Sequence, residues 1–224
     1  MIDYYSDKLY AERLKRVYEI APPRVQQYFE AEINHVLKNI RSGDMVLDLG
    51  CGFGRIVPKL ARLAKSVVGI DTSFTSLLFG QEMLSGISNC YLLQMNAIRL
   101  AFRNNLFDVV VCVQNGISAF HVDQKELIKE SIRIAKRGGK ILFSSYSEKF
   151  WNHRLEWFRL QAEERLLGEI DYAKTRDGVI VCNDGFTATT VSPDQFLSLA
   201  SKLNLEAKIT EVDESSLFCE MRKI

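Results

Sequence analysis

The period of the hydrophobic pattern changes along the chain, and in its middle part it predicts strands that alternate with helices. Five short apolar runs have the length and composition of strands: 45–49, 66–70, 90–94, 107–113 and 140–144. The run at 107–113 is rich in valine and almost continuous, which is typical of a parallel strand covered on both faces. Helical spacing occupies the intervening segments 55–64, 74–84 and 123–138. This alternation predicts right-handed crossovers and a doubly wound, mostly parallel α/β sheet.

Helical spacing also dominates residues 1–42, which we expect to form a helical cap. Two helices are predicted there, separated at Pro22 and Pro23, and the second covers 24–40. Its apolar face comprises Val25, Phe29, Ile33, Val36, Leu37 and Ile40. We place His35, on the same helix, at the protein surface.

The segment 147–191 combines a helix with antiparallel signals. After a predicted helix over 150–167, three short stretches, IDYAKT, GVIVCN and FTATTV, have strand-like composition. They are joined by Asp177-Gly178 and Asp184-Gly185, dipeptides that favour hairpin turns. We therefore expect a small antiparallel meander.

A helix and a strand pair are predicted to close the chain over 192–224. Ser192, Pro193 and Gln195 supply the N-cap, the N1 proline and the capping-box side chain of the helix. The runs 205–212 and 217–223 form the strand pair. Because the sequence has no repeat and no flexible linker, we expect one domain over 1–224.

Composition and charge limit the class of protein. The chain has 224 residues, enough for one α/β domain, and 29 basic residues balance 28 acidic ones. It lacks the basic excess of a dedicated nucleic-acid or membrane-surface binder. The opening segment MIDYYSDKLY does not resemble a secretory signal and no run resembles a membrane span, so we expect a cytoplasmic protein. The 5 cysteines contain no CxxC pair, and we expect neither a disulfide framework nor a metal site.

A glycine-rich turn follows the first predicted strand, in the stretch VLDLGCGFGR at residues 46–55. In an open parallel sheet, ligands bind beyond the carboxyl ends of the strands, where this turn would lie. Glycine allows a ligand to approach the backbone closely, and such a turn offers N–H groups. The spacing is GxGxG, whereas nicotinamide and flavin enzymes have GxGxxG. Asp48, an acid beside this turn, favours a cationic ligand over a pyrophosphate.

These features resemble motif I of the class I S-adenosylmethionine-dependent methyltransferases, a hydrophobic run followed by D-x-G-x-G-x-G. Asp71 ends the second strand in VVGIDTS, where the family has an acid that binds the ribose hydroxyls. Asn96, in LLQMNAIRLAF, stands where the family usually has an aspartate that reads the adenine amino group. FDVVVCVQNG and GGKILFSSY resemble the fourth- and fifth-strand motifs. The resemblance covers about residues 44–146 and implies a Rossmann-like, seven-stranded sheet with a reversed last strand.

The resemblance also implies S-adenosylmethionine as the cofactor, with S-adenosylhomocysteine as its product, bound by a core at 43–146. The implied cofactor-binding residues are Asp48, Gly50, Cys51, Gly52, Gly54, Asp71, Thr72, Asn96, Ala97, Val113 and Gln114. In similar enzymes, N-terminal helices fold over the cofactor and supply a hydroxyl or a cation to its carboxylate. Tyr10 and Arg24 are our candidates for that role.

Methyl transfer requires alignment of nucleophile, methyl and sulfur more than it requires a special side chain. We expect the end of the fourth strand to face the donor methyl, with Asn115 and Tyr146 facing the substrate. His121 and His153 follow the fourth and fifth strands and are the candidate general bases, with surface or capping roles as the alternative. The sequence QNGI lacks the N/D-P-P-Y/F signature of adenine and protein-glutamine amino methyltransferases.

We therefore predict a methyltransferase that acts on a small-molecule acceptor, with 147–191 as a substrate lid. A first alternative is a methyltransferase-like protein that binds the cofactor without turnover. A second is an RNA methyltransferase, which needs a basic surface beside the cleft, for example from Arg99, Arg103, Lys136 and Arg137. A nicotinamide oxidoreductase is opposed by the GxGxG spacing.

Overall fold

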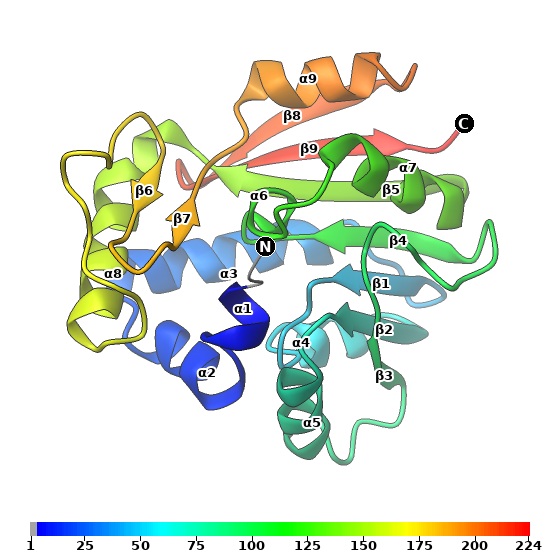
Figure 1. The fold of residues 1–224 in the computed structure, drawn as a ribbon. Coiled ribbons are helices and arrows are strands. Elements are labelled where there is room, and N and C mark those ends of the chain that lie inside the picture. The colour runs from blue at the N-terminus through cyan, green and yellow to red at the C-terminus, as the bar shows by residue number, and fades with distance from the viewer. Residues whose placement is uncertain (1–3) are drawn as a thin grey trace.

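The computed structural model describes residues 4–224, in which a seven-stranded sheet is flanked by helices (Figure 1). The strand order is β3-β2-β1-β4-β5-β9-β8. The strands are β1 (Met45–Leu49), β2 (Ser66–Asp71), β3 (Cys90–Gln94), β4 (Phe107–Cys112), β5 (Ala135–Tyr146), β8 (Ala207–Val212) and β9 (Ser216–Arg222). Strands β1 to β5 pair in parallel, and β9 runs antiparallel to both of its neighbours. This arrangement confirms the predicted Rossmann-like fold with its reversed last strand.

Helices cover both faces of the sheet. They are α1 (Tyr4–Asp7), α2 (Ala11–Glu19), α3 (Pro23–Leu37), α4 (Val57–Ala61), α5 (Phe74–Met83), α6 (Gly116–Ala119), α7 (Gln124–Ile134), α8 (Trp151–Glu163) and α9 (Pro193–Ser201). A short 3-10 turn, η1 (Glu148–Phe150), leads into α8. One core cluster joins α3 and α4 to the sheet, and a second joins α7 and α9 to its other face.

The continuous apolar runs of the central strands supply both core clusters. Successive side chains of a strand point to opposite faces, so Val46 packs with α3 and α4 while Leu47 packs with α7 and α9. Val109 and Val110 divide in the same way on β4, and both are 1% exposed or less. The prediction of a strand covered on both faces is confirmed.

A third core cluster lies beyond the carboxyl ends of the parallel strands. It joins α1, α2, the first half of α3, α8 and a small sheet of β6 (Ile180–Val181) and β7 (Thr187–Ala188). In Figure 1 these elements lie together past the arrowheads of β4 and β5. The N-terminal cap and the insertion therefore cover the same edge of the sheet.

Several predicted boundaries are wrong, because tertiary contacts outweigh local signals. The cap of described residues contains three helices rather than two, and α4 is shorter than 55–64, so that Leu63 is 43% exposed. Helix α7 ends at Ile134, whereas the prediction extended it through Lys136 to Gly138. Ala135 pairs with Phe107 instead, and this extends β5 at its start. His35, expected at the surface, is partly buried: its side chain is 16% exposed and its Nε2 lies 3.1 Å from Glu220 Oε1.

The predicted meander is reduced to β6, β7 and isolated bridges. IDYAKT contributes only the bridge between Ile170 and Cys182. The Asp177-Gly178 turn is present, with φ of 53° and 78°, and closes a bridge between Arg176 and Val179. Helix α9 begins as predicted, with the full capping box of Ser192 and Gln195.

Candidate functional site

A cavity of about 340 Å³ lies at the carboxyl ends of the parallel strands. Most of the predicted site residues line it: Asp48, Gly50, Cys51, Gly52, Asp71, Thr72, Asn96, Ala97, Val113, Gln114, His121 and Tyr146. Five predicted residues do not line it: Tyr10, Arg24, Gly54, Asn115 and His153. The topology therefore brings segments that follow β1, β2, β3 and β4 to one cavity.

The glycine turn after β1 is held by hydrogen bonds within the protein. Gly50 N and Cys51 N donate to Ile70 O at 2.8 and 2.9 Å. Gly54 N donates to Cys51 O at 2.8 Å. Gly52 N donates to Asp71 Oδ2 at 2.8 Å. These four N–H groups are engaged within the protein, so they shape the turn and are not the ones that it would offer to a ligand.

The glycines of this turn admit neighbouring side chains at close range. A Cβ on Gly50 would lie 2.4 Å from the Phe120 ring, and one on Gly52 would lie 2.9 Å from Leu14 Cδ2. Both glycines also have positive φ, 71° and 56°. Glycine is therefore required here by both backbone conformation and packing, and Leu14 ties α2 to the turn.

Asp48 is the buried acid of the site. It is 2% exposed, and its Oδ2 has no hydrogen-bond partner among the described residues. Burial raises the pKa of Asp48 to about 8, although the nearby Arg55 opposes this shift. A buried carboxyl group without a partner is unfavourable, and a cationic group bound in the cavity would satisfy it.

A second buried acid, Glu32 on α3, fixes the end of β4. Its Oε1 accepts hydrogen bonds from Ser144 Oγ at 2.5 Å and from Gln114 N at 3.1 Å. Burial raises the pKa of Glu32 to about 7. Gln114 and Asn115 both have positive φ, 54° and 61°, a conformation that is strained for residues other than glycine. Glu32 stabilises this strained segment at the wall of the cavity.

Asn115 is turned away from the cavity. Its Nδ2 donates to Thr189 O at 2.8 Å, and its Oδ1 accepts from Ser145 Oγ at 2.8 Å. The predicted substrate-facing residue thus links the end of β4 to the segment that follows β7. Tyr146, the other residue predicted to face the substrate, does line the cavity.

The carboxylate of Asp71 organises the turns at the ends of β1 and β2. Its Oδ2 accepts from Gly52 N, and its Oδ1 accepts from Ser73 N at 2.8 Å. Ser73 in turn caps α5 by accepting from Ser76 N at 3.2 Å. Ser73, and not Asp71, is therefore the N-cap of α5.

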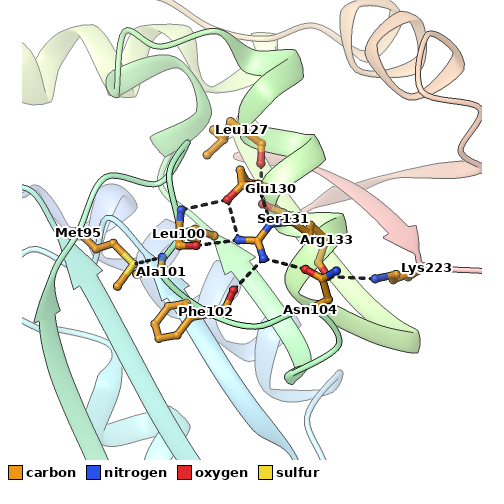
Figure 2. Close-up of polar contacts among 10 residues, drawn as sticks. All are labelled: Met95, Leu100, Ala101, Phe102, Asn104, Leu127, Glu130, Ser131, Arg133 and Lys223. Atoms are coloured by element: carbon orange, nitrogen blue, oxygen red, sulfur yellow. Dashed lines mark hydrogen bonds and ion pairs between the residues drawn. The ribbon is translucent and has the colours of Figure 1, made fainter.

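The segment 95–106, which carries Asn96 and Ala97, is anchored by one arginine of α7 (Figure 2). Arg133 donates to Leu100 O and Phe102 O, both at 2.7 Å. Glu130 holds Arg133 and also accepts from Leu100 N at 3.0 Å. The arginine hydrogen bond lowers the pKa of Glu130. This network positions the loop beside the cavity without entering it.

The two residues predicted to bind the cofactor carboxylate lie elsewhere. Arg24 forms an ion pair with Asp213 at 2.7 Å, and Tyr10 is the backbone N-cap of α2. Instead, Tyr18 of α2 and Arg55 line the cavity. The Arg55 guanidinium lies 4.4 Å from the centre of the Tyr18 ring. These two residues were missed because their positions depend on how α2 packs against the glycine turn.

The two candidate bases have different surroundings. His121 lines the cavity, whereas His153 is exposed in the first turn of α8. The basic residues named for an RNA surface are also divided. Lys136 and Arg137 begin β5 at the opposite edge of the sheet, where Lys136 pairs with Asp108 at 2.7 Å.

Within residues 4–224, no group of three side chains is arranged to hold a metal ion, and no helix meets the length and apolarity of a bilayer span. The cysteines at 51, 90, 112, 182 and 219 are all free. Burial raises the pKa of the Cys51 thiol well above its usual range, so this thiol is protonated and unreactive near neutral pH.

Comparisons with known proteins show which domains resemble the central part of this chain. Residues 46–139 match a family model described as a methyltransferase domain. The ubiquinone/menaquinone biosynthesis C-methyltransferase UbiE of Pseudomonas paraeruginosa is 32% identical over 118 residues, which are 50% of this chain and 45% of that protein. The chain thus matches less than half the length of this relative.

Two solved structures share the whole fold. The PH0226 protein from Pyrococcus horikoshii has a TM-score of 0.70 at 21% identity, with 100% of both chains covered. A complex of DhpI with S-adenosylhomocysteine (SAH) has a TM-score of 0.66 at 18% identity, covering 99% of this chain and 96% of DhpI. At these identities the likeness concerns the fold.

Proposed function

We propose that this chain, a member of the class I S-adenosylmethionine-dependent methyltransferase family, binds S-adenosylmethionine and transfers its methyl group to a small organic acceptor. This proposal starts from two findings: residues 46–139 match a methyltransferase-domain model, and the sheet has the strand order β3-β2-β1-β4-β5-β9-β8. The acceptor, the reaction and the site residues are the parts that we propose. A cytoplasmic location remains a prediction from the sequence.

The observation that carries this proposal is the cavity itself. Residues after β1, β2, β3 and β4 line one continuous space at the carboxyl edge of the sheet. In a doubly wound sheet this edge is where ligands bind, beside the point at which strand order reverses. Strand β1 lies at that point here, between β2 and β4.

The lining residues fit the three chemical parts of S-adenosylmethionine. We assign Asp71 to the ribose, and Asn96 and Ala97 to the adenine. The unpartnered Oδ2 of Asp48 matches the cationic amino group, and Arg55 with Tyr18 matches the carboxylate. When bound, the cofactor supplies an electrophilic methyl group on a sulfonium.

The protein's own contribution is alignment and exclusion of water. Val113 and Gln114 follow β4 and border the cavity, and Gln114 is held by the hydrogen bond from its N–H to Glu32 Oε1. Holding the reacting groups in line can contribute on the order of 7 to 11 kcal/mol. Of the two candidate bases, we retain His121 for acceptors that must lose a proton.

We further propose that 147–191 and the N-terminal helices together form the lid over the acceptor. Tyr4 Oη donates to Asp184 Oδ2 at 2.6 Å, and Arg16 pairs with Glu164 at 3.0 Å. These contacts join the N-terminal helices to the segment 147–191. A lid closed in this way favours a small molecule over a polymer.

Parallel calorimetric titration with S-adenosylmethionine, SAH and NADH tests the cofactor. We expect micromolar binding of the first two and none of NADH. Binding of NADH alone would refute the assignment. Gly52→Val is a second test: its side chain would meet Leu14, so cofactor binding should be lost, provided that circular dichroism shows a folded protein.

Turnover is tested with methyl-labelled S-adenosylmethionine and a panel of small acceptors. Labelled product supports a methyltransferase. Cofactor binding with no product from any acceptor supports the alternative of a protein that binds without turnover.

A further inference from the structure

One end of the cavity is built from aromatic rings, and we call it the aromatic arm. It is lined by Tyr5, Tyr18, Tyr146, Trp157 and Phe158 together with Gln161. Tyr146 ends β5, and the last three residues belong to α8, which follows β5 in the chain. Asp71 and Asn96 lie at the ends of β2 and β3, on the other side of β1. Tyr146 and the α8 residues of the arm therefore lie toward β5, across β1 from the nucleoside residues.

Gln161 is an unpaired polar group in this apolar arm. It is 2% exposed, it lines the cavity, and its Nε2 has no hydrogen-bond partner among the described residues. A buried amide donor without a partner is unfavourable, because it has lost its hydrogen bonds to water. The cavity that it borders is the place from which a bound molecule can supply the missing acceptor.

Arg154 places a buried positive charge against the same arm. It is 1% exposed, and its guanidinium lies 4.5 Å from the centre of the Tyr146 ring and 5.5 Å from that of Phe158. It donates to Gly178 O at 2.8 Å and to Ala188 O at 3.1 Å.

The charge of Arg154 is not neutralised by the protein. No ion pair to a carboxylate is found for it among the described residues, and its Nε has no hydrogen-bond partner there. Burial itself lowers the pKa of Arg154, because the charged guanidinium is removed from water. A buried cation without an opposite charge attracts an anion strongly, because the local dielectric constant is low.

We infer that the aromatic arm binds a planar aromatic acceptor whose anionic oxygen group is anchored by Gln161 in the field of Arg154. This inference rests on the proposed function and narrows its acceptor. The rings provide faces for an aromatic body, Gln161 Nε2 donates to the oxygen group, and Arg154 compensates its charge through the lining. The anionic group is the anchor, and the methylated atom is elsewhere on the molecule.

The experiment compares three phenols of different charge on the protein saturated with SAH. The probes are 4-hydroxybenzoate, 4-hydroxybenzamide and the cation tyramine, titrated by calorimetry at pH 7.5. We expect 4-hydroxybenzoate to bind at least tenfold more tightly than the amide, and tyramine not to bind. Cyclohexanecarboxylate, an anion without an aromatic ring, should bind at least fivefold more weakly than 4-hydroxybenzoate.

Two variants test the anchor. Gln161→Glu places a like charge against the anion and should abolish 4-hydroxybenzoate binding while the amide still binds. Gln161→Leu removes the donor and should weaken the binding of 4-hydroxybenzoate about tenfold. This variant provides the test if Gln161→Glu does not fold. Asn152→Asp is the matched control, since it makes the same change of charge at an exposed position of α8.

Each result has one meaning. Equal affinity for the acid and the amide, no binding of any aromatic probe, or unchanged 4-hydroxybenzoate affinity in both Gln161 variants would overturn the inference while leaving the methyltransferase proposal intact. Failure of wild-type protein to bind SAH in the first titration would instead overturn the proposed function.

Discussion

At the scale of single residues, Asp48 links the charge of the protein to the charge of its ligand. Burial raises its pKa to about 8, and its Oδ2 has no hydrogen-bond partner among the described residues. At pH 6.5 the free protein therefore holds Asp48 mainly in the protonated form. A bound ammonium group stabilises the carboxylate and lowers this pKa, so that the proton is released.

The first prediction is that cofactor binding at pH 6.5 releases about one proton, the most that a single carboxyl group of raised pKa can release. Affinity should accordingly increase as pH rises from 6 toward 7.5. Calorimetry in two buffers of different ionisation enthalpy measures the proton count. Asp48→Asn should reduce the count to near zero, and a wild-type protein that released none would contradict the assignment of Asp48.

The second prediction concerns Asp71, whose oxygens already hold Gly52 N and Ser73 N. Asp71→Asn weakens charge-assisted hydrogen bonds to the ribose and the bond that shapes the turn. We expect a loss of about 1.5 to 3 kcal/mol in cofactor binding, or roughly 10- to 150-fold. Titration with SAH measures it, with Asp194→Asn, an exposed acid of α9, as the control. Unchanged affinity would remove Asp71 from the site.

At the scale of elements, hydrogen bonds from α7 hold the loop 95–106. Arg133 is the central group, with Glu130 on one side and the carbonyls of Leu100 and Phe102 on the other (Figure 2). The third prediction is that Arg133→Leu releases this loop and weakens cofactor binding about tenfold, the loss of ~1.4 kcal/mol. Hydrogen exchange should increase over 95–106.

Lys129→Leu is the control for this variant. Lys129 lies on the same helix and pairs with Glu126 in solvent, so its loss should leave the loop unchanged. If both variants bind SAH as wild type does, Asn96 and Ala97 do not depend on this network.

The proposed lid over the cavity depends on a contact between α1 and the segment that connects β6 to β7. Tyr4 donates to Asp184, and its ring lies 4.8 Å from that of Phe186. The fourth prediction is that Tyr4→Phe removes about 1 kcal/mol from this contact and increases proteolysis within 4–19 several-fold. Tyr172→Phe, at a tyrosine that is 62% exposed, should have no effect. Equal proteolysis of both variants would show that the bond does not hold the cover.

Sequence reasoning succeeded where structure depends on neighbouring residues along the chain. The valine-rich run of β4, the glycine turn and the capping box of α9 were all predicted, because each is a local pattern with one physical solution. The end of α7 was not, since Ala135 pairs with Phe107 and Lys136 pairs with Asp108, both on the neighbouring strand β4. Tyr18, Arg55 and Gln161 reach the cavity only through packing between distant segments. Glu32 did carry a signal: it is an acid beside Phe29 and Ile33 on an apolar helix face.

At the scale of the whole molecule, two buried acids make stability depend on pH in a direction opposite to most carboxylates. Burial raises the pKa of Glu32 to about 7 and that of Asp48 to about 8. In the unfolded chain both ionise near pH 4. Between pH 4 and 8 the folded protein therefore binds more protons than the unfolded chain. The stabilisation is complete below the unfolded values and is lost as pH rises through 7 and 8.

The fifth prediction is that the unfolding temperature of the free protein decreases from pH 5 to pH 8. Saturation with S-adenosylmethionine should make the decrease smaller, because the complex already holds Asp48 ionised beside a cation. Thermal unfolding at one-unit steps of pH, with and without the cofactor, measures both slopes. Glu32→Gln should flatten the profile between pH 5 and 7, whereas Glu30→Gln, at an exposed position of the same helix, should not. A free-protein profile that rises over this range would mean that the two acids are ionised in the folded state, and the cation-binding role of Asp48 would then lose its physical basis.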